Sequence, residues 1–156
     1  MVGTPVNRFS IVMQYADGGD LLQKITERKN NKVFFRESQV WRALIEMVHG
    51  LKAMHDLNLM HRDIKSANIF LYKPQTKQVE KSIDANSNEK GSFLFQAKIG
   101  DMNVSKLVKN GMNFTQTGTP YYASPEVWRD EQYGTESDIW SLGCVIYEML
   151  ALKPPF

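Results

Sequence analysis

The sequence predicts an α+β fold in which a mainly helical core carries a few short strands. Residues 38–55 and 137–151 repeat apolar side chains at the three- and four-residue spacing of an amphipathic helix. Three short apolar runs, at 9–13, 69–71 and 93–99, are typical of strands. A length of 156 residues allows one domain or part of a larger one.

Charge and composition exclude several classes of protein. The 19 Lys and Arg against 17 Asp and Glu leave a net charge of +2, too near neutral to indicate a nucleic-acid or membrane partner. A single cysteine, Cys144, cannot form an internal disulfide, which indicates a reducing compartment. The N-terminus has no apolar signal-peptide core, and the most apolar stretch, 139–152, is short enough to be a buried helix.

The first half of the chain contains a strand and two helices in the predicted order. The strand at 9–13 is followed by a loop of Ala-Asp-Gly-Gly at 16–19, after which Asp20 can cap a short helix that continues through Ile25. Ser38 opens the first long helix. Its apolar positions are expected to form one buried stripe of Val40, Trp41, Leu44, Ile45, Val48, Leu51 and Met54.

The second half contains a hairpin and the second long helix. The strand at 69–71 is expected to pair with 93–99, and the polar residues 73–92 between them form an exposed insertion, a candidate docking segment for a partner. A segment rich in Thr, Gly and Asn runs from 105 to 125. Residues 1–156 contain no internal repeat, and nothing in their sequence indicates a second domain.

The polar loop at 61–68 carries the strongest chemical signal. It reads His-Arg-Asp-Ile-Lys-Ser-Ala-Asn, which places Asp63, Lys65 and Asn68 at spacings of two and three between a helix and a strand. Gly-Asp-Met-Asn at 100–103 follows the hairpin. Further along the chain come Thr-Pro at 119–120, Ser-Pro-Glu at 124–126 and Asp-Ile-Trp-Ser-Leu-Gly at 138–143. Chance would rarely produce these motifs in this order.

With these motifs, the chain resembles a eukaryotic protein kinase, and most closely a NIMA-related (Nek) serine/threonine kinase. The closeness rests on residues 11–21, 68–71 and 118–126. The resemblance implies a partial kinase fold, with a hinge strand and the helical C-lobe core but without the N-lobe and the end of the C-lobe. Without a glycine-rich loop and an ATP-binding Lys, the isolated chain is expected to be an inactive fragment.

The resemblance also implies ATP with Mg²⁺ or Mn²⁺ as cofactors and transfer of the γ-phosphate to Ser or Thr hydroxyls of a protein substrate. Asp63 would orient the substrate hydroxyl, and Lys65 would reach the transferred phosphate. Thr119 would complete the hydroxyl pocket. Asn68 and Asp101 would hold the metal through hard oxygen ligands.

At the nucleotide end, the resemblance makes Met13 the gatekeeper residue. The backbone of Gln14 and Ala16 would meet the adenine edge, and Phe70 would form its apolar floor. Asp20 has two readings that can coexist: contact with the ribose, or a helix N-cap alone.

Regulation by phosphorylation follows from the same resemblance. Arg62, directly before Asp63, can pair with a phosphate on the activation segment. Thr115 occupies the position of the activating phosphothreonine, with Thr117 as second choice. The resemblance also implies that His61 packs rather than catalyses and that Asp138 holds the loop backbone.

Two competing functions are a pseudokinase-like interaction module without catalysis and a small-molecule phosphotransferase of related fold. The intact Asp63, Lys65, Asn68 and Asp101 argue against the first, and the motifs at 118–120 and 124–126 argue against the second. Protein kinases usually carry Asp-Phe-Gly where this chain has Asp-Met-Asn at 101–103. This departure puts in question how easily the segment flips between conformations. The expected location is intracellular and cytoplasmic, with cytoskeleton, cilium or nucleus suggested by the resemblance alone.

Overall fold

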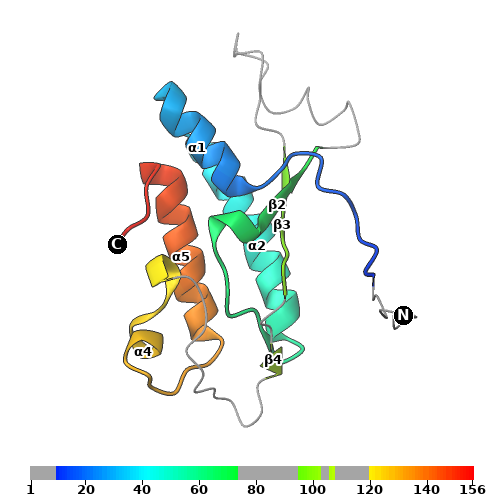
Figure 1. Cartoon of the computed structure of the whole chain (residues 1–156), viewed down its shortest axis with the longest axis vertical. Helices are drawn as coiled ribbons and strands as arrows, with labels where there is room; N and C mark the ends of the chain where they lie inside the picture. Colours follow the sequence, from blue (N-terminus) through cyan, green and yellow to red (C-terminus); the bar gives the residue numbers. More distant parts are fainter. Residues whose placement is uncertain (1–9, 74–94, 103–105, 108–119) are drawn as a thin grey trace, which may run out of the picture.

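The structure, a computed structural model, describes four stretches of the chain: residues 10–73, 95–102, 106–107 and 120–156. Its frame consists of helices α1 (Leu21–Asn31), α2 (Glu37–His55) and α5 (Glu136–Ala151). Helices α2 and α5 pack side by side, and a small antiparallel hairpin lies against α2 (Figure 1). Helices with a small antiparallel sheet form the α+β class that the sequence predicts.

Helix α1 begins where Asp20 was expected to cap it. The Asp20 carboxylate accepts a hydrogen bond from the Gln23 backbone nitrogen at 2.8 Å, which satisfies one of the free N–H groups of the first turn. Leu21 and Ile25 are the buried residues of this helix. The helix extends to Asn31, well beyond Ile25, the last residue that the sequence assigned to it.

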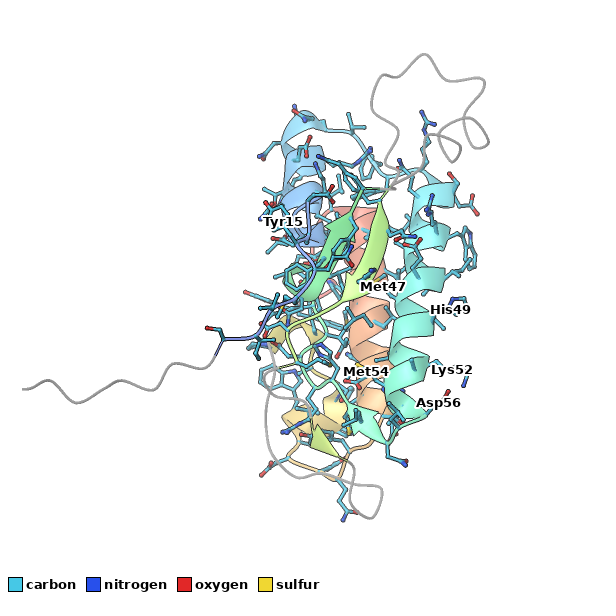
Figure 2. The ribbon with its side chains drawn as sticks, turned by 90° about the vertical axis from the view of Figure 1, so that its right-hand side faces the viewer. Tyr15, Met47, His49, Lys52, Met54 and Asp56 are labelled. Atoms are coloured by element: carbon cyan, nitrogen blue, oxygen red, sulfur yellow. The ribbon has the colours of Figure 1, made fainter. Side chains whose placement is uncertain are left out.

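Helix α2 buries only part of the predicted stripe: Val40 and Leu51 are buried as expected, but Ala43 and Met47 take the place of Trp41 and Ile45 in the core. Figure 2 shows Met47 on the side that faces the hairpin, and His49 and Lys52 on the opposite side. Of the predicted stripe, Trp41 and Ile45 are 56% and 52% exposed. Both faces carry apolar residues at helical spacing, so periodicity alone could not identify the packed one. The buried residues of α2 are Val40, Ala43, Met47 and Leu51.

The strand predicted at 9–13 is not formed in its described residues, 10–13. Val12 is 97% exposed, and a strand needs a ladder partner that no described segment provides here. The chain instead joins the sheet a few residues later. The Gly18 backbone nitrogen donates to the Leu71 carbonyl at 2.9 Å, and the Leu71 nitrogen donates to the Gly19 carbonyl at 2.9 Å.

The predicted hairpin is confirmed. Strand β2 (Ile69–Tyr72) pairs antiparallel with β3 (Gln96–Ile99), with Ile69 opposite Ile99. The outer edge of β3 faces α2, where the Ala97 nitrogen donates to a carboxylate oxygen of Glu46 at 2.6 Å. Residue 73 of the expected insertion is described, and 74–92 lie outside the described residues.

Several short elements were not predicted. Strand β1 (Leu59–Met60) pairs with β4 (Lys106–Leu107), which lies within the Thr-, Gly- and Asn-rich segment. The other short elements are η1 (Ser66–Asn68), η2 (Pro120–Tyr122) and α4 (Pro125–Trp128).

The main core forms where α1, α2, α5 and the hairpin meet. Its fully buried side chains include Leu21, Met47, Ile69, Leu71, Val145 and Met149. Another side of α5 remains exposed and apolar, with Ile139 55% and Leu150 53% exposed. In the described part of the chain, no helix combines the length and apolar character needed to cross a membrane.

Candidate active site

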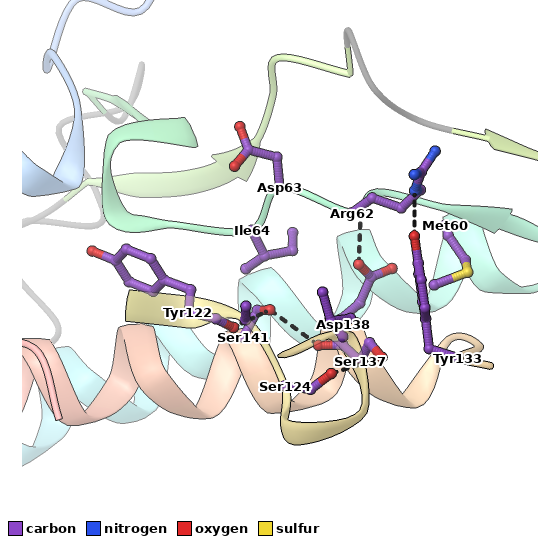
Figure 3. Close-up of a pocket in the computed structure, with 12 residues that line it drawn as sticks. Met60, Arg62, Asp63, Ile64, Tyr122, Ser124, Tyr133, Ser137, Asp138 and Ser141 are labelled. Carbon is purple, nitrogen blue, oxygen red and sulfur yellow. Dashed lines mark hydrogen bonds between the residues drawn. The ribbon is translucent and has the colours of Figure 1, made fainter. Parts of the chain in front are cut away.

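The loop at 61–68 is anchored to α5 by the buried carboxylate of Asp138. One carboxylate oxygen accepts the Arg62 backbone nitrogen at 2.8 Å, and the other accepts the His61 nitrogen at 2.9 Å and lies 2.8 Å from His55 Nε2. Figure 3 shows Asp138 directly beneath Arg62. The structural role predicted for Asp138 is therefore confirmed. The sequence reasoning assigned nothing to His55, whose position at the end of α2 was the only available signal.

His61 joins this loop to the segment that carries Asp101. Its buried ring places Nε2 2.9 Å from the Gly100 carbonyl, while Nδ1 accepts the Asp63 backbone nitrogen at 3.3 Å. Because Nδ1 accepts, Nε2 carries the proton and donates to Gly100. The Gly100 nitrogen in turn donates to the Asn68 carbonyl at 3.0 Å. Gly100, the residue before Asp101, is thus hydrogen-bonded to the loop through both its carbonyl and its nitrogen.

Three predicted site residues meet at the Asp63 carboxylate. Lys65 Nζ lies 2.7 Å from Asp63 Oδ2, and Asn68 Nδ2 donates to the same oxygen at 3.0 Å and to the Asp63 carbonyl at 2.8 Å. The Asp63 side chain points away from Asp138 (Figure 3). The structure therefore brings a carboxylate, a cation and an amide together on one short loop.

The side-chain oxygens of Asn68 and Asp101 fit a hard divalent cation. The Asn68 amide nitrogen is committed to Asp63, so the group that Asn68 can offer a metal is its amide oxygen. Asp101 adds an exposed carboxylate. Across the described stretches, no group of three or more His, Cys, Asp or Glu side chains could hold a metal ion by itself.

Two site residues adopt a strained backbone. Arg62 has φ of 70° and Asp101 has φ of 58°, both in the left-handed region that non-glycine residues rarely occupy. Such a conformation costs of the order of 1–3 kcal/mol and persists only where the surroundings enforce it. The Asp138 carboxylate enforces it at Arg62, and the bonds of Gly100 hold the approach to Asp101.

The nucleotide-side residues are partly brought together. Phe70 is half-buried on β2, and a Cβ built on Gly100 would lie 2.5 Å from its ring, so only glycine allows this close approach. Asp20 is linked to Phe70 by an isolated antiparallel bridge and also caps α1. The N-cap reading of Asp20 is confirmed by the Gln23 contact.

The expected hinge residues lie on an exposed segment. Met13 is 74% exposed, and Ala16 is half-buried. Gln14 contacts the hairpin twice: its side-chain oxygen accepts Lys98 Nζ at 2.8 Å, and its carbonyl accepts the Tyr72 hydroxyl at 3.4 Å. The backbone of Gln14, which is expected to meet the adenine edge, thus contacts β2 through its carbonyl.

The regulatory residues are only partly described. Arg62 Nε donates to the Tyr133 hydroxyl at 3.2 Å, above a hollow of about 20 Å³ (Figure 3). That space holds no more than a water molecule and cannot admit a nucleotide. The expected phosphorylation sites Thr115 and Thr117 and the pocket residue Thr119 lie outside the described residues.

Glu126 is hydrogen-bonded to the N-terminal turn of α5. Its carboxylate accepts the Ser137 hydroxyl at 2.7 Å, and Ser137 also accepts from Ser124 at 3.0 Å. Burial alone would raise the pKa of Glu126, but hydrogen bonding to Ser124 and Ser137 outweighs it and lowers the pKa below the ordinary value. The Ser137 hydroxyl is therefore a partner of Glu126 within this chain.

Comparison with known proteins identifies the family. Residues 3–156 match the family model described as protein kinase domain, so the chain belongs to the protein kinase family. Its relatives are NIMA-related kinases. It is 40% identical to human serine/threonine-protein kinase Nek5 over 151 residues, which cover 96% of this chain and 18% of that protein.

Two further relatives extend this result. Mouse serine/threonine-protein kinase Nek3 is 40% identical over 148 residues, which cover 94% of this chain and 25% of that protein. The probable serine/threonine-protein kinase nek2 of Dictyostelium discoideum is 35% identical over 160 residues, which cover 100% of this chain and 34% of that protein. The chain thus spans between about a fifth and a third of the length of these relatives.

Proposed function

We propose that this chain forms part of a Nek-type serine/threonine protein kinase that transfers the γ-phosphate of ATP to Ser and Thr hydroxyls of proteins. The observation that carries the proposal is the convergence of Lys65 and Asn68 on the Asp63 carboxylate. Positioned charges of this kind are the main requirement of phosphoryl transfer, because the reaction asks the protein mainly to orient oxygens and neutralise negative charge.

Each residue of this cluster has a separate task. Asp63 accepts the proton of the substrate hydroxyl, and Asn68 holds its carboxylate in place through the 3.0 Å hydrogen bond. Lys65 offers its cation to the transferred phosphate, and Thr119 closes the hydroxyl pocket. The oxygens of Asn68 and Asp101 would hold Mg²⁺ or Mn²⁺, which supplies charge neutralisation to the phosphates when bound.

The proposed nucleotide side uses the segment next to β2. Met13 is the gatekeeper, Gln14 and Ala16 present backbone groups to adenine, and Phe70 forms the apolar floor. Support comes from the 2.8 Å contact of Gln14 with Lys98, which ties this segment to the hairpin that carries Phe70. A ribose contact of Asp20 would use its second oxygen, because Oδ1 accepts from the Gln23 nitrogen.

The proposal includes regulation by phosphorylation. A phosphate on Thr115, or on Thr117, would pair with Arg62, whose guanidinium is held in place by the Tyr133 hydroxyl. The polar stretch 73–92 is proposed as a docking segment for a protein partner. An intracellular location is supported by the single, buried Cys144.

Radiolabelled phosphate transfer to a protein substrate tests the proposal, in a version of the chain extended at both ends to a complete kinase domain. Asp63→Ala should lower the rate by roughly 10²–10⁴, the usual contribution of a general base. Asp56→Ala, which removes an exposed carboxylate at the end of α2, is the matched control. Absence of transfer, or equal transfer by the Asp63 variant, would favour the pseudokinase-like module. Transfer to small molecules alone would favour the phosphotransferase.

A further inference from the structure

The segment at 14–19 runs beside the hairpin into α1 (Figure 1) and is hydrogen-bonded to the hairpin at both of its ends. At the end nearer α1, the nitrogen of Lys73, the residue after β2, donates to the Asp17 carboxylate at 2.8 Å. The Gly18 nitrogen donates to the Leu71 carbonyl at 2.9 Å. Backbone groups take part in both contacts, so this end of the segment is fixed to β2.

The other end is held by a lysine of β3. Lys98 Nζ donates to the Gln14 side-chain oxygen at 2.8 Å and lies 4.6 Å from the centre of the Tyr72 ring. The Tyr72 hydroxyl in turn donates to the Gln14 carbonyl at 3.4 Å. The hairpin therefore holds Gln14 through its side chain and through its backbone.

The register of the hairpin explains why Lys98 can reach this position. Lys98 lies opposite Phe70 in the antiparallel pair, and directly opposite residues project from the same face of a sheet. Tyr72 is two residues beyond Phe70 and projects from this face too. The other face, which carries Ile69 and Leu71, is buried in the core. The lysine therefore belongs to the same surface as the proposed adenine floor.

Apolar packing contributes little to holding the start of this segment. Ile11, Val12 and Met13 are exposed, and Tyr15 is 84% exposed. A stretch that buries so little apolar surface gains little from the hydrophobic effect. In the described structure, the position of residues 14–16 therefore depends on the polar contacts of Gln14.

We propose that Lys98 and Tyr72 are positioning residues that hold the segment at 14–16 in the form that presents its backbone to the adenine of ATP. This inference rests on the proposed kinase function. A binding segment that is fixed in advance loses less conformational entropy when its ligand binds, which strengthens binding. The Gln14 carbonyl can accept from Tyr72 and from the adenine amine together, because a carbonyl oxygen has two lone pairs.

Isothermal titration calorimetry of ATP binding to the extended kinase version tests this role. Lys98→Met keeps a long side chain but removes the cation, so the Kd for ATP should rise about fivefold while the KM for a peptide substrate stays unchanged. Lys98→Arg keeps a cationic donor and should restore most of the affinity. Because Lys98 is exposed, these replacements should leave folding intact.

Lys52→Met is the matched control for the change in charge. It removes one lysine from an exposed ion pair with Asp56 on α2, and Figure 2 places Lys52 on the opposite side of the molecule from Tyr15. Its Kd for ATP should equal that of the wild type. An unchanged Kd in Lys98→Met, or the same rise in Lys98→Met and Lys52→Met, would overturn the inference.

A double-mutant cycle separates positioning from simple attraction between the lysine and the triphosphate. Gln14→Leu removes the acceptor of Lys98 without changing any charge, and it should also raise the Kd for ATP. The two increases should not multiply in the double variant, because each single change already removes the same contact. Increases that multiply would show that Lys98 acts on ATP through its charge alone and would refute the positioning role.

Backbone NMR order parameters of the 156-residue chain give a readout that needs neither ATP nor activity. In Lys98→Met, the order parameters of residues 14–16 should fall toward the flexible value of about 0.6, whereas those of β2 should stay near the rigid value of about 0.85. Unchanged order parameters at 14–16 would show that Lys98 does not hold the segment.

The two kinds of measurement separate the two hypotheses. An extended protein that binds no ATP, although Lys98→Met loosens residues 14–16, contradicts the proposed function and with it the nucleotide role, while the contact with the hairpin stands. An extended protein that binds ATP equally well with and without the Lys98 cation contradicts only the positioning role.

Discussion

The Asp138 carboxylate accepts the backbone nitrogen of Arg62 at 2.8 Å, although 76 positions separate the two residues in the chain. This hydrogen bond holds the loop that carries Asp63 in a fixed position against α5. It also stabilises the left-handed backbone at Arg62, where φ is 70°. The geometry of the proposed catalytic loop is therefore determined by a helix much later in the sequence.

Removing this anchor should destabilise the chain. Asp138→Ala leaves the buried His61 nitrogen, the partly buried Arg62 nitrogen and the His55 ring without their acceptor, so the free energy of unfolding should fall by about 3 kcal/mol. Urea denaturation followed by circular dichroism measures this loss. Asp56→Ala, at an exposed ion pair with Lys52, should leave the midpoint unchanged. Equal midpoint shifts in the two variants would contradict the assigned role of Asp138.

Glycine 100 should be intolerant of a methyl group. Gly100→Ala places a Cβ 2.5 Å from the Phe70 ring, so the ring or the strand end must move, and the Tm should fall by several degrees. Gly143→Ala provides the opposite control, because nothing lies within 4 Å of its Cβ and alanine favours helix by up to about 1 kcal/mol. Differential scanning calorimetry should show opposite signs. A Gly100 variant as stable as the wild type would refute the close packing.

Alkaline pH should weaken the fold partly through Tyr122. Burial raises its pKa from 10.0 to about 12, so the folded state favours the neutral phenol. The resulting stability is complete below pH 10 and is lost as the pH rises to about 12. Urea midpoints across this range should fall more steeply for the wild type than for Tyr122→Phe. Parallel pH profiles would show that Tyr122 titrates normally.

Acid pH should weaken the fold partly through Glu126. Because its pKa lies below the ordinary value of 4.5, its contribution to stability is present above that pH and is lost as the pH falls through the lowered pKa. Ser137→Ala removes the 2.7 Å hydrogen bond to Glu126, so acid unfolding should begin at a higher pH. Acid titration followed by tryptophan fluorescence measures the midpoint. Ser10→Ala, which changes an exposed serine, is the control.

The elements with strong local signals were predictable. Asp20 caps α1 as expected, and the second long helix spans Glu136–Ala151 against a prediction of 137–151. The pairing of 69–71 with 93–99 followed from two apolar runs with a polar stretch between them. The strand predicted at 9–13 is not formed in its described residues, 10–13. The apolar residues there suit a strand, but a strand also needs a neighbour to pair with, and the local sequence does not show whether one is present.

The residues of the candidate site were also only partly predictable from the sequence. The spacing of Asp63, Lys65 and Asn68 indicated a shared cluster before any coordinates, and the three side chains do converge on the Asp63 carboxylate. The partners His55 and Ser137 could not be found, because each acts on a residue from a different element. A histidine at the end of a helix has no distinctive pattern until the opposite carboxylate is located.

The order of residues along this chain was sufficient to predict the three longer helices, the hairpin and the motif at 61–68, because capping, apolar spacing and motif spacing are local properties. Three-dimensional packing alone selected the Ala43 and Met47 face of α2 over the Trp41 and Ile45 face. It also joined Ser66 to Glu148 through Tyr122. These choices depend on the burial and hydrogen bonding of groups that are far apart in sequence, and such free energies exist only once the chain has folded.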